Sequence, residues 1–264
     1  DGELTWGNES GINLGSSLPQ FLGPVGGGGW AKLMPSSFAV GQFVKEERPA
    51  KSDTKYDKRM YASLFFNPEA LGDVVKNEKW YGGNRSMEQL WESNSGKMAG
   101  GAPTFSLGDG KFLLKKYTAY FANDGNADNM GHKEGKSNNV RAMRFAEVLL
   151  MYAEALNEIS YSNSQTSDAM VALNAVHTRA GLSPVQITEL ADQDSFRKAI
   201  MLERQQEFPY EGHRWFDLVR MGGAKEAMKA EGHTIQDFQF LYPIPKTELE
   251  RINNTELLWQ NPGY

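Results

Sequence analysis

The glycines of this chain are unevenly distributed, and their distribution separates two kinds of sequence. Of the 27 glycines, 21 lie before residue 141 and six lie after it. Glycine at high density favours turns and loops, because it adopts backbone conformations that other residues avoid. We therefore predict a mostly α-helical fold with a Gly-rich and aromatic-rich, loop-dominated part over residues 1–140 and a helical part over residues 141–264. The two parts are expected to form one intertwined domain.

The composition excludes several classes of protein. With 264 residues the chain is long enough to bury a full hydrophobic core. It has no Cys, which excludes disulfide-stapled scaffolds and Cys-based zinc sites. The formal charge of -5 argues against nucleic-acid binding, since affinity for phosphates comes from Lys and Arg. No run approaches 18 apolar residues, so no membrane span is predicted.

Helical periodicity begins just after residue 141. Six apolar residues recur at the spacing of one helix face: Phe145, Val148, Leu149, Tyr152, Ala153 and Leu156. A polar break at 160–165 leads to a second helix that ends at Gly181. The resulting helical hairpin over 141–181 is close in length to one tetratricopeptide unit, and the chain contains no second copy. One such unit cannot bury its own face, so further units must lie elsewhere or be absent.

Other elements are predicted from local signals. A third helix should start near Asp194 and Ser195, where either side chain can cap it, and should break at Phe208 because Pro209 follows. A short helix over 211–221 and a helical turn over 247–250 are expected after it. The residues that favour strands lie in segments 60–66 and 111–117.

The densest charge cluster surrounds Glu203 and Glu207. Carboxylates four residues apart share a helix face and could form the acid and base of a glycosidase. The alternative is a structural network in which they pair with Arg204, Arg214 and Arg220 and tie the third helix to the fourth. We favour the network, because a general acid needs a raised pKa and neighbouring guanidinium groups lower it. With no nucleophile elbow in the sequence, we predict no catalytic residue and no enzyme activity.

Metal and cofactor sites are not predicted either. The four histidines, at 132, 177, 213 and 233, are far apart and lack metal-ligand spacing. Segment 124–135 begins like a calcium loop but has Asn129 where Gly is needed and Gly135 where a bidentate Glu is needed. We expect neither a metal ion nor a cofactor.

Aromatic residues next to glycines and amides indicate a ligand instead. Aromatic rings stack on the apolar faces of neutral polyhydroxylated ligands, while amides and Lys bond the hydroxyl groups. The candidate stacking rings are Trp30, which follows four glycines, and Trp6, Trp80 and Tyr81; the candidate hydroxyl partners are Asn8, Lys32 and Asn84. The alternative for Trp30 is a flexible loop whose ring folds onto the core.

The second half also carries motifs in a familiar order. They are residues 144–158 (RFAEVLLMYAEALNE), 172–182 (ALNAVHTRAGL), 203–220 (ERQQEFPYEGHRWFDLVR), 242–245 (YPIP) and 260–264 (QNPGY). Over 141–264 this sequence resembles the C-terminal part of the SusD/RagB family, and Asp57 with Arg59 is similar to the Asp-x-Arg motif of that family. One departure is His177, which stands where the family commonly has Arg.

The resemblance implies a fold and a function. The fold is mostly α-helical, with tetratricopeptide-like helix pairs packed on a loop-rich region that holds the ligand. The function is that of a lipoprotein on the extracellular face of the outer membrane, which delivers oligosaccharides to a SusC-like TonB-dependent transporter. Members are longer than this chain, which is expected to be a C-terminal portion without the lipid anchor. The alternatives are a peptide-capturing relative, a helical protein–protein interaction module and a glycoside hydrolase.

Overall fold

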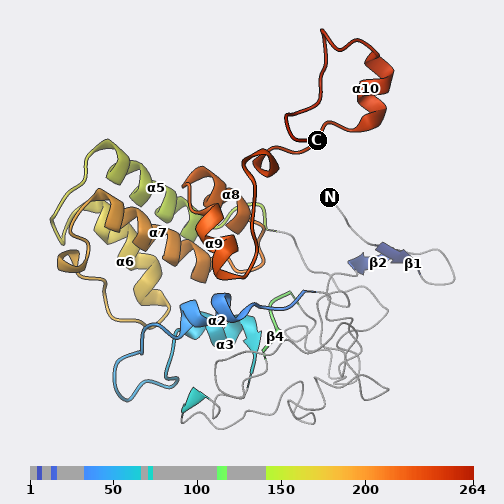
Figure 1. Cartoon of the computed structure of the whole chain (residues 1–264). Helices are drawn as coiled ribbons and strands as arrows, with labels where there is room; N and C mark the ends of the chain where they lie inside the picture. The colour runs from blue at the N-terminus through green and yellow to red at the C-terminus, as the bar shows by residue number, and fades with distance from the viewer. Residues whose placement is uncertain (1–4, 8–12, 17–32, 67–70, 74–111, 118–140) are drawn as a thin grey trace. The chain divides into compact units, whose positions relative to one another are not determined.

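A computed structural model describes residues 5–7, 13–16, 33–66, 71–73, 112–117 and 141–264 of the chain (Figure 1). Most of this described part is helical, as predicted, with short strands. The chain divides into two compact units, Asp1–Glu211 and Gly212–Tyr264. The predicted division into residues 1–140 and 141–264 stays a prediction.

The first unit contains these elements: β1 (Thr5–Gly7), β2 (Asn13–Ser16), α2 (Ser37–Phe43), α3 (Lys58–Ser63), β3 (Leu64–Phe65), β4 (Leu113–Leu114), α5 (Phe145–Ile159), α6 (Asp168–Arg179), the 3-10 turn η4 (Ile187–Glu189) and α7 (Gln193–Glu207). β1 pairs with β2 and β3 with β4, both antiparallel. The hairpin predicted over 141–181 is present as α5 and α6, which lie side by side (Figure 1).

The main hydrophobic core lies between α5, α6 and α7. It is formed by the buried residues Ala146, Leu150, Ala153, Ala169, Met170, Ala172, Leu173, Val176, Leu190, Phe196, Ile200 and Phe208. Leu150, Met170 and Ile200 are fully buried, one from each helix. Small alanines beside these large side chains let the helices approach closely.

The face that α5 buries differs from the face that its periodicity indicates. Of the six residues on the predicted stripe, Phe145, Val148 and Tyr152 are exposed, and only Ala153 is fully buried. The buried face is centred on Leu150, so Ala153, Leu149 and Leu156 of the stripe contact the core, whereas its other three residues do not. This happens because α5 is apolar around most of its circumference, so periodicity alone does not select the buried side.

The helix ends follow from local chemistry. Ser167 caps α6 by accepting a hydrogen bond from the Met170 N–H, and Gly181 follows its last turn with φ of 86°. This left-handed backbone conformation favours glycine, and a Cβ at this position would also displace the Arg48 guanidinium group. α7 is capped by Asp192, in a reciprocal capping box with Ser195, and not by Asp194 or Ser195 as predicted.

A second hydrophobic cluster joins α2, α3 and the strands. Its buried members are Val40, Phe43, Tyr56, Met60, Leu64, Phe66 and Phe112. The strand predicted over 60–66 is wrong for its first half, because residues 60–63 complete α3, which Asp57 caps through the Arg59 N–H. Only Leu64 and Phe65 are extended, and they pair with Leu114 and Leu113.

The second unit consists of α8 (Arg214–Arg220), α9 (Ala224–Ala230), the 3-10 turn η5 (Asp237–Phe240) and α10 (Lys246–Ile252). These agree with the short helix predicted over 211–221 and the turn predicted over 247–250. The C-terminal tail returns to the segment before α10, where the Gln260 side chain bonds both the N–H and the C=O of Ile244. The Tyr264 hydroxyl donates to the Leu241 carbonyl at 2.9 Å.

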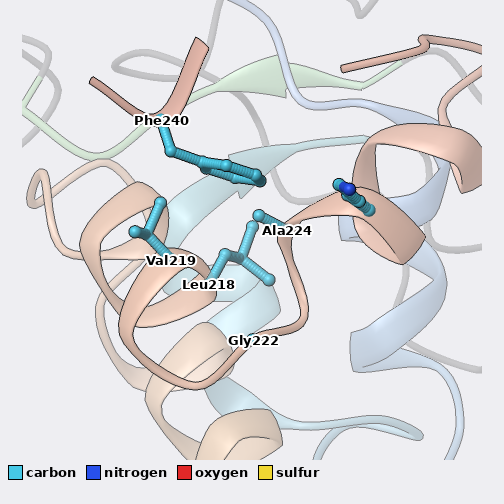
Figure 2. A pocket seen from close by; sticks show the side chains of 6 residues that line it. Leu218, Val219, Gly222, Ala224 and Phe240 are labelled. Carbon is cyan, nitrogen blue, oxygen red and sulfur yellow. The ribbon is translucent and has the colours of Figure 1, made fainter. Parts of the chain in front are cut away.

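A small pocket of about 190 Å³ lies within this second unit. Figure 2 shows the ring of Phe240 facing Leu218 and Ala224 across it. Its one charged lining residue, Lys225, pairs with Asp237. A neutral sugar needs several free hydrogen-bonding groups, so we do not assign this pocket to one.

Candidate functional site

The structure places one of the seven predicted glycan-binding residues in a regular element. Trp6 is the central residue of β1, in a ladder that pairs Thr5 with Ser16 and Gly7 with Asn13. The other six lie outside the described residues: Asn8, Trp30, Lys32, Trp80, Tyr81 and Asn84. For Trp80, Tyr81 and Asn84, the described residues show the strands β3 and β4, between which this part of the chain runs.

Residues 67–111, which carry Trp80, Tyr81 and Asn84, connect β3 to β4, and of these residues the structure describes 71–73. β3 leads into this segment and β4 leads out of it, and the two strands pair with each other. The rings of Phe66 and Phe112 stack with centroids 5.6 Å apart. The two ends of the segment are thus held together over the second hydrophobic cluster.

A network of buried charges is centred on α7 and includes Arg59 of α3, the helix that leads into β3. Arg59 of α3 donates from Nη1 to Glu203 Oε1 at 2.5 Å and to Glu207 Oε2 at 3.3 Å. Its Nη2 donates to Asp57 Oδ2 at 2.6 Å and to Gln206 Oε1 at 3.2 Å. The side chains of Glu203 and Glu207 are only 3% exposed. One guanidinium group thus joins α3 to Glu203, Gln206 and Glu207, which share one face of α7.

Two further arginines complete the shell around Glu207. Arg144 Nη1 donates to Glu207 Oε1 at 2.7 Å, and Arg179 Nη2 donates to the same oxygen at 2.5 Å. Burial alone would raise the pKa of Glu207, but the hydrogen bonds from Arg144 and Arg179 outweigh it and hold the pKa below its usual value. Glu207 is therefore an ionised, fully engaged carboxylate.

Glu211, just beyond the end of α7, binds two cations. Arg144 donates to its two oxygens at 2.9 and 2.7 Å, a bidentate geometry, and Lys116 Nζ lies 2.5 Å from Oε1. Burial opposes ionisation, yet the hydrogen bonds from Arg144 and Lys116 lower the pKa of Glu211. Lys116 lies two residues after β4, so its ion pair with Glu211 connects the chain that leaves β4 to the end of α7.

His177 of α6 supplies another cation. Its Nδ1 lies 2.7 Å from Glu203 Oε2, and its Nε2 lies 3.3 Å from Glu46 Oε2. Burial alone would lower the pKa of His177, but the two carboxylates overcome it and raise the pKa to about 9. The imidazolium form suits this position at neutral pH, because Nδ1 hydrogen-bonds Glu203 and the positive charge lies close to Glu46, although Nε2 makes no hydrogen bond.

The structural network was predicted correctly in kind but with the wrong partners. The arginines that hold Glu203 and Glu207 are Arg59, Arg144 and Arg179. Of the predicted partners, Arg204 Nη2 lies 3.9 Å from Glu147, and Arg220 pairs with Asp217 at 2.8 Å. The network joins α7 to α3, to α6 and to Arg144 before α5.

The chemistry of this cluster is structural. A general acid needs a protonated carboxyl near neutral pH, whereas Glu207 and Glu211 have lowered pKa values and are surrounded by cations. Among the residues that the structure describes, no group of three or more His, Asp or Glu side chains is arranged to hold a metal ion. In the same part of the chain, no helix combines the length and the apolar character needed to cross a membrane.

Comparison with curated proteins identifies relatives of this chain. SusD-like protein P2 of Formosa agariphila is 37% identical over 155 residues, which cover 55% of this chain and 29% of that protein. SusD-like protein P38 of the same organism is 32% identical over 123 residues, 42% of this chain and 24% of that protein. The chain thus matches less than a third of the length of these relatives.

Solved structures share the fold. A SusD superfamily protein from Bacteroides vulgatus aligns with a TM-score of 0.66 and 21% identity, over 93% of this chain and 47% of that one. A SusD-like protein from Bacteroides fragilis aligns with a TM-score of 0.58 and 18% identity, over 99% of this chain and 53% of that one. The sequence profile of the SusD family matches residues 1–264. The chain therefore belongs to the SusD family, as its motifs predicted.

Proposed function

We propose that this chain is the ligand-binding part of a non-enzymatic, lipid-anchored receptor on the outer face of the outer membrane. It binds oligosaccharides and delivers them to a SusC-like TonB-dependent transporter. The observation that carries this proposal is the SusD-family match over the whole chain. The anchor belongs to the whole protein, and α5 with α6 represents a tetratricopeptide-like unit of its helical scaffold.

The binding surface in this proposal is formed by the aromatic and amide residues of the Gly-rich part. Trp6, Trp30, Trp80 and Tyr81 stack on sugar rings, and Asn8, Lys32 and Asn84 bond hydroxyl groups. Each stacked ring contributes about 0.5–1.5 kcal/mol beyond its area burial, so affinity depends on several rings together. The lowered pKa of Glu207 supports binding without hydrolysis, because an ionised carboxylate is not available as a general acid.

A glycan array followed by affinity electrophoresis tests this function. The 264-residue chain should be retarded by at least one polysaccharide, and Trp30→Ala should strongly weaken the retardation without unfolding the chain. Trp259→Ala is the matched control, because Trp259 is an exposed tryptophan of the second unit, outside the proposed surface. Equal retardation of both variants and the parent would remove Trp30 from the site. Binding of oligopeptides with no binding of glycans would favour the peptide-capturing relative.

A further inference from the structure

Helix α5 carries a second apolar face that the hydrophobic core does not use. Along the whole helix, apolar and exposed residues recur at alternating steps of three and four positions: Phe145, Val148, Tyr152, Ala155 and Ile159. These five residues form the open seam. Their spacing is that of the contact positions of packed helices, which recur on average about every 3.5 residues. The open seam therefore has the pattern of a helix–helix interface, yet its residues are exposed.

The open seam is continuous and uncharged. Phe145 and Ile159, at its two ends, are 74% and 81% exposed. Met151, which is also exposed, lies beside the seam, three residues after Val148 and four before Ala155. Single exposed apolar residues are ordinary on a protein surface, whereas a contiguous row of them marks an interaction site. The open seam thus fits a partner whose contacting face is itself apolar.

The packing around α5 indicates where such a partner comes from. Helices α6 and α7, which follow α5 in the chain, pack on its buried side. The described helices that precede α5, α2 and α3, pack on α7 instead. In an array of helical hairpins each unit packs between the unit before it and the unit after it. The following helices are in place, so the open seam is left for a helix that precedes α5.

The length of the related proteins leaves room for this helix. About half of each of the two aligned SusD-family structures has no counterpart in the present chain. We propose that the open seam is the docking face for a helical hairpin from the part of the whole protein outside residues 1–264. This hairpin extends the stack of α5, α6 and α7 by one unit on the α5 side and meets the seam with an apolar row of its own. The proposal does not depend on the ligand.

Hydroxyl-radical labelling of unmodified proteins tests the docking face. The 264-residue chain and the protein made from the complete reading frame are labelled under the same conditions. Labelling of Phe145, Met151 and Ile159 should be about fivefold slower in the longer protein, because the core of a helix–helix interface excludes solvent. Phe216 is the matched control, since it is an exposed phenylalanine of the second unit. Its labelling should be equal in the two proteins.

A substitution at the start of the seam gives a second readout. Phe145 is the first residue of α5, where an added carboxylate complements the helix dipole. Phe145→Glu should therefore change the melting temperature of the 264-residue chain by less than about 1 °C. In the longer protein it should lower the melting temperature by about 5 °C or more, because the carboxylate is buried without a partner. Phe216→Glu, which places the same charge in the first turn of α8, should lower neither.

Four results would overturn the proposal. The first is equal labelling of the seam in the two proteins, and the second is a reading frame that adds no helical segment to residues 1–264. The third is a lower melting temperature of the 264-residue chain with Phe145→Glu, which would show that the seam is covered within this chain. The fourth is a dimer of this chain, detected by sedimentation, that Phe145→Glu dissociates, which would assign the seam to a second copy.

Discussion

Helices α5 and α7 have the same length and belong to the same core, yet they invert the usual relation between polarity and burial. α5 exposes Phe145 and Ile159 by 74% and 81%, whereas α7 buries Glu203, Arg204 and Glu207 to 5% exposure or less. On α7 the buried carboxylates are matched by cations from earlier elements. The difference teaches that charged side chains can be buried on a helix where the fold supplies cations to pair with them.

The largest expected effect comes from removing a partner of α7. Arg59→Ala should lower the free energy of unfolding by about 3–5 kcal/mol, because it leaves buried carboxylates without their shared cation. Chemical denaturation followed by circular dichroism measures this. Lys198→Ala, which removes a cation from the exposed face of the same helix, should change stability by less than about 1 kcal/mol. Equal effects of the two variants would contradict the difference between the faces of α7.

A smaller change in the free energy of unfolding is expected for substitutions in α5, and its size should differ between the buried and the exposed face of that helix. Leu150→Ala should cost about 2–5 kcal/mol, since Leu150 is fully buried and the change leaves a cavity. Phe145→Ala removes a larger side chain from the exposed face and should stay within about 0.5 kcal/mol. The same denaturation measurement applies to both. A Phe145→Ala variant as unstable as Leu150→Ala would show that the stripe predicted from periodicity is the buried face.

The smallest effect is a dependence on pH through His177. Its pKa is raised from 6.5 to about 9 in the folded chain, so its contribution to stability is complete below pH 6.5 and is lost as the pH rises through 9. The loss should be about 2 kcal/mol, the size of hydrogen bonds to a charged group.

His177→Arg is the control for this pH dependence, because arginine keeps its charge throughout that range. Melting temperatures of the parent and the variant between pH 6 and pH 10 measure the difference. Parallel profiles would show that His177 does not titrate between Glu203 and Glu46.

Local signals allowed much of the helical part to be predicted. Pro209 ends α7 at Phe208, and Gly181 follows α6, as their backbone preferences require. The N-cap of α7 was missed because Asp192, Asp194 and Ser195 all carry suitable side chains within four residues. Local sequence does not distinguish them, whereas the reciprocal hydrogen bonds between Asp192 and Ser195 in the fold do.

Long-range pairing could not be predicted in the same way. Arg59 and Glu203 are 144 positions apart, so no spacing rule connects them. In the sequence, Asp57 and Arg59 are recognisable only as a family motif, and the arginines near Glu203 and Glu207 along the chain were the expected partners. The charges that must be buried could be recognised, but the cations that neutralise them are brought by the packing of α3 and α6. The roles of all seven predicted glycan-binding residues remain predictions: six lie outside the described residues, and only the backbone of Trp6 is described.

The central claim is that this chain binds glycans while its paired carboxylates are structural. The most direct measurement is size-exclusion analysis of a polysaccharide before and after prolonged incubation with the chain, on a sample that affinity electrophoresis shows to be bound. The account predicts a retained polysaccharide of unchanged chain length. Shortened products that form with the parent chain and disappear with a folded Glu207→Gln variant would contradict it.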